Sequence, residues 1–459
     1  MKTGSTSNNT LIKKICLGLG LFLLAASVAS APFSGGFEGL IEGWKTILIT
    51  PCPLITDYFG VGGVAGTFFN AAICSLSCLL LAHLCRGRTN ASFLAAYMLL
   101  IAHCFYGMNF LNIWPCYIGV IIYYYRKKKD FREHLHIAMF SMAFGPLVSE
   151  MLFRYTLGDT YVQGEVHITL AGILLTLAVG LAAGLVLPGM LEGALWMHKG
   201  YNLYNGGLAF GLVGGLLYAF LYKSLGRKST GPMAPNFPFY DGVGESNWLF
   251  ANIFFILLFG TALLIGRILN KKSFNGYKEL IKETGYWSNF SEKYGMPLCL
   301  INFGIYGFMV LAYMNLIMLL SDGVAFTGPT VGAVFAAMTF AAIGQHPRNT
   351  WSIFAGYGAL SLFVTIFCAL RGEAVPWTLS TQGYINGVAF ATGLAPMAGR
   401  YSWKVGIAAG IISASLCTST AAIHGGFMLF NGGFTAGITA LILVPILEHH
   451  FPHMKVKGE

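Results

Sequence analysis

The sequence predicts an all-α, multi-pass transmembrane helical bundle built from two internal repeats, with re-entrant or broken helices. Of its 459 residues, 56% are hydrophobic and only 10% are charged, whereas soluble domains carry roughly 25% charged residues. Apolar stretches that are long enough to cross roughly 30 Å of hydrocarbon recur almost to the C-terminus. A glycine-rich motif also occurs once in each half of the chain. Together these observations exclude a soluble globule.

The N-terminal part, residues 1–44, contains the first apolar stretch, near 11–31. Lys13 and Lys14 precede this stretch, and it ends in Ala29-Ser30-Ala31. Such an ending is also found in cleaved signal peptides. Because many more apolar stretches follow, we expect an uncleaved signal-anchor helix and then an external loop.

The remaining chain divides into two halves, which we expect at residues 45–223 and 298–448. Residues 224–297 between them predict an external loop, one transmembrane helix and a basic cytoplasmic linker, and residues 449–459 a C-terminal tail. Several candidate spans are short or rich in glycine, so we expect about ten to fourteen complete spans and some half-helices. The candidates lie near 11–31, 61–85, 91–108, 113–126, 136–156, 168–190, 203–223, 248–268, 296–320, 329–345, 351–370, 382–398, 403–421 and 432–448.

The net charge of +10 comes from short basic runs between apolar stretches. Two of these runs, 126–129 and 267–293, are expected on the cytoplasmic side because cytoplasmic loops carry an excess of Lys and Arg. This pattern favours a membrane protein, in contact with the lipid bilayer, over a nucleic-acid-binding protein. The sequence leaves open whether the protein forms a homo-oligomer. The ten cysteines lie mostly in apolar stretches and predict neither disulfides nor a metal site.

The two halves share the pattern H-x-G-[YF]-x-L-[YF]-N-G-G. Residues 198–207 read HKGYNLYNGG, and residues 424–433 read HGGFMLFNGG. Repeats of this kind are common in transporters and channels, where the solute site lies between the repeats.

The polar residues of the motif are the first candidates for a solute site: His198, Asn202, Asn205, His424 and Asn431. The His and Asn of each pair are seven residues apart, about two helical turns, so in a helix they share one face. One interpretation is a solute path lined by neutral hydrogen-bonding groups. The other is that these residues bond helices to one another while the glycines allow close packing.

Two aspartates upstream also align, Asp57 and Asp322, each before a glycine-rich apolar segment. They predict either carboxylates at a pore mouth or helix N-caps. With this alignment the orientation of the repeats stays open. The basic runs place both aspartates on one side of the membrane, but place His198 inside and His424 outside.

Two glutamates are the acidic residues most embedded in apolar sequence, Glu150 and Glu192. Burying a charged residue within the membrane costs free energy, so such residues are candidates for a functional role. Glu192 and His198 together suggest a proton-coupled pair. The chain contains no HExxH, GxSxG or GxxxxGK[ST] motif, so we predict no catalytic residues, no metal and no cofactor.

The doubled motif resembles an uncharacterised family of bacterial membrane proteins, known only as a domain of unknown function. This resemblance covers nearly the whole chain and implies no activity. The repeats are also similar to those of urea-channel-like proteins. The segment nearest to their N-P-x-T-G motif reads Gly328-Pro329-Thr330-Val331-Gly332, in one half only.

We therefore expect a transporter or channel of the bacterial inner membrane that moves a small polar solute between two pseudosymmetric repeats. The alternative is an intramembrane enzyme that acts on a lipid-linked substrate, and a structural or assembly factor is a third class. A water-filled cavity at the repeat interface would favour transport, whereas an enzyme of this kind should open sideways to the bilayer.

Overall fold

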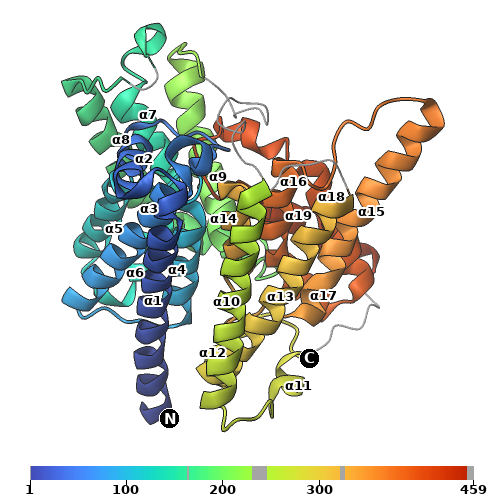
Figure 1. Ribbon diagram of the computed structural model, residues 1–459. Coiled ribbons are helices and arrows are strands. Elements are labelled where there is room, and N and C mark those ends of the chain that lie inside the picture. The colour runs from blue at the N-terminus through green and yellow to red at the C-terminus, as the bar shows by residue number, and fades with distance from the viewer. Residues whose placement is uncertain (1, 163–164, 230–244, 321–325, 452–459) are drawn as a thin grey trace.

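The computed structural model describes residues 2–162, 165–229, 245–320 and 326–451, and all regular elements in these ranges are helical (Figure 1). Nine of the described helices are long and apolar enough to cross a membrane. The predicted all-α, multi-pass bundle is confirmed. The number of long helices lies below the ten to fourteen spans expected, because several apolar stretches form short or interrupted helices instead.

The first repeat contains nine α-helices in its described residues, of which α6 and α7 together form one broken helix. Its elements are α1 (Lys2–Ser30), α2 (Gly36–Ile49), α3 (Tyr58–Leu84), α4 (Ala91–His103), α5 (Trp114–Arg126), α6 (Leu135–Ser141), α7 (Gly145–Phe153), α8 (Leu170–Met197) and α9 (Asn205–Tyr218).

The second repeat has the same order of elements except that it lacks an equivalent of α2, and α15 is longer than α5 whereas α18 is shorter than α8. Its elements are α10 (Glu245–Leu269), α13 (Met296–Leu320), α14 (Gly328–Ala337), α15 (Pro347–Arg371), α16 (Gln382–Ala391), α17 (Ala395–Arg400), α18 (Trp403–Leu416) and α19 (Asn431–His450), with α11 (Tyr277–Leu280) and α12 (Phe290–Lys293) in the linker after α10.

The sequence dictates two features that both repeats share. The short helices α4 and α14 are each capped at the N-terminus, where Asn90 accepts from Phe93 N–H and Thr327 accepts from Thr330 N–H. A side-chain oxygen at this position satisfies a free N–H of the first turn. Two broken helices, α6–α7 and α16–α17, are each interrupted by a 3₁₀ turn. Proline at the second position of α7 and of α17 fits there, because the first turn of a helix needs no N–H from it.

The first two long helices of each repeat pack against each other in opposite directions. In the first repeat, Ser27 Oγ donates to the carbonyl of Ala65, and Thr89 Oγ donates to that of Asn9. In the second, Trp248 donates to Asn315 at 2.8 Å, and a Cβ on Gly266 would lie 2.8 Å from the backbone nitrogen of Ile301. Thus α1 and α10 hold equivalent places, each as the first helix of a repeat.

The two repeats are inverted with respect to each other. The ring centroids of Phe22 and Phe254 lie 4.9 Å apart, whereas Asn8, near the start of α1, donates to the carbonyl of Ser291, which lies between α10 and α13. Helix α1 therefore runs antiparallel to its counterpart α10, and Figure 1 shows α1 rising from the N-terminus while α10 descends. The pseudo-two-fold axis lies across the helices.

This inversion corrects the alignment of Asp57 with Asp322. Asp57 precedes α3, the second long helix of its repeat, whereas Asp322 follows α13, the helix equivalent to α3. Asp322 itself lies outside the described residues. The two aspartates therefore hold different places in the order of the helices.

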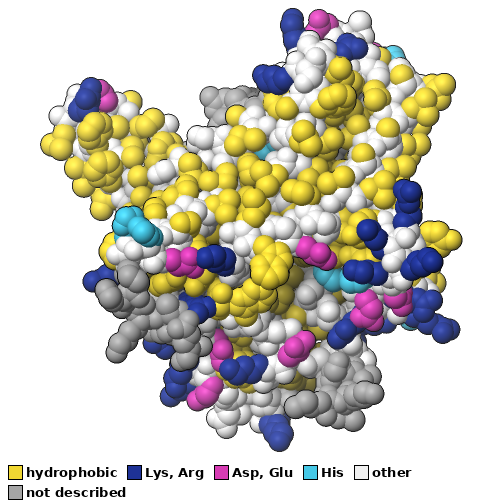
Figure 2. Space-filling model, turned by 180° about the vertical axis from the view of Figure 1, so that it is seen from behind, with side chains coloured by type: hydrophobic (Ala, Val, Ile, Leu, Met, Phe, Trp, Pro, Cys, Tyr) yellow, Lys and Arg dark blue, Asp and Glu magenta, His cyan; other side chains and the backbone are white. Residues whose placement is uncertain are grey.

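The surface is typical of a membrane protein. Figure 2 shows hydrophobic side chains covering the middle of the molecule, with Lys, Arg, Asp and Glu gathered mainly toward one end. Leu, Ile and Phe side chains are widely exposed on the long helices, as at Leu257, Leu319 and Phe363. In water, an exposed apolar surface of this extent would be unfavourable.

Candidate functional site

The repeated motif forms two loops that cross between the repeats. Leu203 N–H, before α9, donates to the carbonyl of Gly393 at 2.9 Å, and Leu429 N–H, before α19, donates to that of Ala143 at 3.0 Å. Gly393 and Ala143 are the middle residues of the two equivalent 3₁₀ turns. Each loop is therefore bound to the broken helix of the other repeat, as two-fold symmetry requires.

The same turn begins both helices that follow. Tyr204 N–H donates to the Oδ1 of Asn202 at 3.0 Å, and Phe430 N–H donates to the sulfur of Met428 at 2.9 Å. Asn202 also lies against the other repeat, where its side-chain nitrogen is 3.4 Å from the carbonyl of Gly433. These two turns hold equivalent places and show that the motif is a true repeat.

Helices α9 and α19 touch where they begin. A Cβ on Gly207 would overlap the carbonyl carbon of Gly433, and a Cβ on Gly433 would lie 3.1 Å from the Cα of Gly207. The pseudo-two-fold axis passes between these equivalent glycines. From this point the two helices run in opposite directions, so both positive helix ends lie at the centre of the molecule.

A cavity of about 310 Å³ ends at this contact. We call it the central cavity, and its rim includes the exposed side chain of Trp287. Its lining contains hydrogen-bonding groups but no Asp, Glu, Lys or Arg. The lining residues are Ser92, Ala95, Leu99, His136, Ile137, Phe140, Leu191, Leu195, Gly200, Asn202, Leu203, Tyr204, Asn205, Gly206, Gly207, Trp287, Ser288, Phe340, Ile343 and Phe430.

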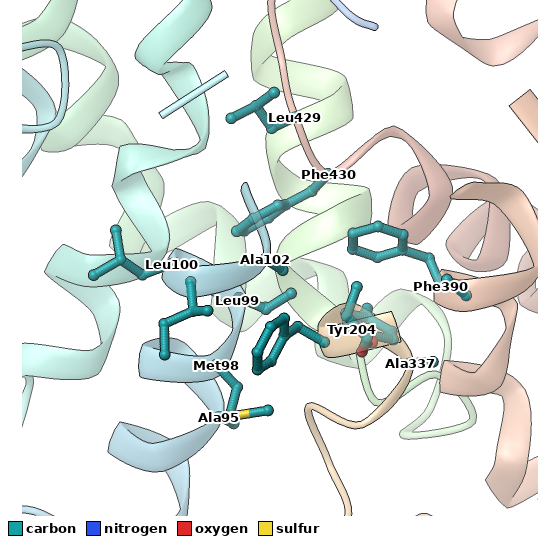
Figure 3. Close-up of a cluster of buried hydrophobic side chains, with 14 of the residues drawn as sticks. Ala95, Met98, Leu99, Leu100, Ala102, Tyr204, Ala337, Phe390, Leu429 and Phe430 are labelled. Atoms are coloured by element: carbon teal, nitrogen blue, oxygen red, sulfur yellow. Dashed lines mark hydrogen bonds between the residues drawn. The ribbon is translucent and has the colours of Figure 1, made fainter. Parts of the chain in front are cut away.

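Aromatic rings pack at the inner end of the central cavity. Figure 3 shows Phe430, Phe390 and Tyr204 beside Leu99 of α4. The ring of Tyr204 lies 5.1 Å from that of Phe390 and 4.7 Å from that of Phe340. Three of these aromatic residues, Tyr204, Phe340 and Phe430, line the cavity, and Tyr204 also donates to the carbonyl of Ala336.

The two His/Asn pairs differ. His424 Nε2 and Asn431 Oδ1 lie 3.0 Å apart, and Asn431 also donates to the carbonyl of Cys417. In the first repeat, Asn205 lines the central cavity, but its Oδ1 is buried and has no surface open to the cavity. His198 is fully buried and its side chain interacts with that of Asn205, although no close hydrogen bond joins them. The second pair is joined by a hydrogen bond of 3.0 Å, whereas the first pair is more open.

A family model described as a protein of unknown function (DUF1576) matches residues 37–223 and 269–449. The chain belongs to the DUF1576 family. The matched segments cover most of both halves, so the predicted resemblance to an uncharacterised membrane family is confirmed. Searches of curated proteins and of solved structures gave no match.

Of the predicted acidic residues of this DUF1576 protein, the three that the structure describes, Asp57, Glu150 and Glu192, do not line the central cavity. Asp57 is fully buried and caps two helices, since its Oδ1 accepts from Phe59 N–H of α3 and from Gly328 N–H of α14, each at 2.9 Å. This geometry corresponds to the N-cap interpretation. Glu192 is exposed on α8, whereas His198 is buried, so the described contacts do not bring the proposed proton pair together.

Glu150 is buried in an ion pair. Both of its oxygens lie 2.9 Å from Arg154 Nε, and Tyr222 donates to Oε1 at 2.7 Å. Its charge is therefore matched within the protein.

Sequence reasoning missed the aromatic residues of the DUF1576 site, above all Phe340, Phe390 and Phe430. The chain contains 36 phenylalanines, so no single one stands out. The available signal was the position of Phe430 inside the repeated motif, directly before Asn431.

Proposed function

We propose that this protein is a transporter or channel of the bacterial inner membrane that moves a small, uncharged polar solute through the central cavity. The observation that carries this proposal is a cavity without charged side chains in its lining that ends where the two inverted repeats meet, with Asn205 among its lining residues.

The class of solute follows from the lining. No charged side chain faces the central cavity, so a bound ion would lose its hydration without a countercharge. A neutral solute needs only hydrogen bonds, which Asn205, Ser92 and Ser288 can offer. The volume of about 310 Å³ lies at the lower end of small-molecule sites.

The architecture supports the same function. In many transporters, inverted repeats meet near the membrane midplane, and discontinuous helices direct their positive ends at the solute. Here α9 and α19 begin at the pseudo-two-fold axis after non-helical loops. Non-helical backbone at membrane depth is tolerated where it is buried in protein or lines a cavity.

For an intramembrane enzyme, the chain offers Glu150 and Glu192 as acidic candidates. Glu150 is held by Arg154 and Tyr222, and Glu192 is exposed on α8. An acid used in catalysis needs a place for a substrate beside it, and neither residue lines the central cavity. The geometry therefore favours transport.

The test is solute flux through proteoliposomes, followed by light scattering with urea and glycerol as probes. We expect wild-type protein to raise the permeability to at least one probe above that of protein-free vesicles. Asn205→Ala should lower this flux about two- to tenfold, the effect of one lost hydrogen bond. The matched control is Asn275→Ala, an exposed linker position, which should leave the flux unchanged.

Asn431→Ala separates transport from folding. It leaves His424 and the carbonyl of Cys417 without their bonds, so it should lower the thermal stability more than Asn205→Ala does. The proposal fails if Asn205→Ala is folded and transports both probes as the wild type does. It also fails if the wild type leaves the permeability of the vesicles unchanged.

A further inference from the structure

A second cavity, of about 400 Å³, lies between the two repeats on another side of the bundle. We call it the side cavity. It is formed by α1 and α4 of the first repeat and by α10, α13 and the segment after α14 of the second. Its walls are almost entirely apolar, with Phe22, Leu258 and Phe303 among them.

The side cavity opens on the outer surface between α1 and α10. Of its lining residues, Gly18 of α1 and Thr261 and Ile265 of α10 are exposed. A Cβ on Gly18 would meet no atom within 4 Å. Both helices are candidate membrane spans, so the opening faces the hydrocarbon of a bilayer.

The pseudo-two-fold axis relates this space to a second one, which is filled. The axis exchanges α1 with α10, α3 with α13 and α4 with α14, so the counterpart lies between α10, α14, α1 and α3. There, the ring of Phe254 lies 4.9 Å from Phe22, 5.0 Å from Phe68 and 6.0 Å from Phe335. Each of the four helices supplies one of these rings.

The side cavity therefore lacks the apolar material that its counterpart contains. Protein interiors are close-packed, and a cavity of several hundred Å³ is uncommon. Water does not fill it well, since water needs two to four polar partners. In a bilayer, the apolar material at such an opening is the acyl chain of a lipid.

The charge at the opening of the side cavity indicates which lipid head group would bind there. Lys14 is exposed and is the one charged residue in the lining of the side cavity. It lies in the first turns of the candidate span Asn8–Phe33, near the end of α1 that also carries Lys13. A lysine at such a place extends its ammonium toward the membrane surface. No acidic residue lines the cavity to compete for it.

We propose that the side cavity binds one acyl chain of an anionic phospholipid whose phosphate pairs with Lys14. The lipid bridges the two repeats on the side where the protein supplies no phenylalanine cluster. This site is separate from the central cavity and does not depend on the transport function.

The experiment is native mass spectrometry of the full-length protein after reconstitution into vesicles of equal parts phosphatidylglycerol and phosphatidylcholine and extraction in a mild detergent. We expect one retained phospholipid, with phosphatidylglycerol favoured about fivefold, as for one lysine near an anionic surface. Lys14→Gln should remove this preference. Gly18→Phe should fill the opening and remove the lipid.

Two further variants secure the result. Thr261→Phe fills the same opening from α10, in case Gly18→Phe does not fold. Gly193→Phe on α8 is the matched control, because a Cβ there also meets no atom within 4 Å, and it should keep the lipid. If both Gly18→Phe and Thr261→Phe still retain the phospholipid, the proposed lipid site is wrong. It is also wrong if the wild-type protein retains no lipid. An unchanged preference in Lys14→Gln overturns the head group, and a dimer that Gly18→Phe dissociates would show that a second copy occupies the cavity.

Discussion

At the scale of single residues, Asp57 shows how one buried carboxyl group serves two helices. Its Oδ1 accepts from the N–H groups at the beginnings of α3 and α14, which belong to different repeats. Burial raises the pKa of Asp57 to about 7, against the opposing effect of the N–H bonds from Phe59 and Gly328. The folded protein therefore holds this proton more tightly than the unfolded chain, in which aspartate titrates near 3.9.

Asp57→Asn and Asp57→Ala separate the hydrogen bonds from the charge. The asparagine keeps an acceptor for both N–H groups, whereas alanine leaves both unpaired, at about 1–3 kcal/mol each. Protonated Asp57 stabilises the folded state. This stabilisation is fully present below the pKa of the unfolded chain and is lost as the pH rises through the folded pKa of about 7. Thermal unfolding in detergent at pH 5 and pH 8 should therefore show a larger fall in wild type than in Asp57→Asn. An equal fall in both, with Asp57→Ala as stable as Asp57→Asn, would contradict this role.

At the scale of helices, the contact between α9 and α19 depends on having no side chain at its closest point. Gly211 and Gly437 continue this contact, since a Cβ on Gly211 would overlap the ring of Phe434 and one on Gly437 would lie 2.8 Å from Leu208. These two contacts are exchanged by the pseudo-two-fold axis. The glycines of the motif thus set how closely the two repeats approach.

Gly207→Ala should destabilise the protein by about 1–3 kcal/mol, the usual cost of excess volume in a packed interior. The added Cβ would overlap backbone atoms of Gly433, which cannot rotate away. Gly189→Ala on α8 is the matched control, because a Cβ there meets no atom within 4 Å. Unfolding in detergent should separate the two variants, and equal midpoints would exclude a tight contact at the axis.

The sequence predicts the helices and the repeated motif better than it predicts how the two repeats are oriented relative to each other. The doubled motif identified the correct loops because His, Asn and Gly are distinctive in an apolar chain. The direction of the second repeat could not be inferred, because it depends on which short helices cross the membrane and α4 and α14 are short. The central cavity could not be predicted from the sequence, because its lining residues Ser92, Asn205 and Trp287 come from three distant segments that only the fold brings together.

At the scale of the whole molecule, an odd number of membrane passages in the first repeat explains the inversion. His198 then lies toward one side of the membrane and His424 toward the other, as their positions in the inverted repeats require. The basic turn after α5, residues 126–129, the end of α10 and the linker lie at the same lower end of the molecule (Figure 1). The positive-inside rule predicts that this end is cytoplasmic.

This orientation can be tested by thiol labelling of intact cells. All ten native cysteines are free, nine are buried, and Cys85 is the one that is not, so Cys85→Ser gives a suitable background. In it, Lys128→Cys should resist a membrane-impermeant reagent added outside, whereas Thr160→Cys, in the exposed turn after α7 at the opposite end, should react. Both positions are exposed, so a difference reports the side of the membrane rather than burial. Labelling of Lys128→Cys from outside would reverse the orientation and would place the rim of the central cavity at the external face.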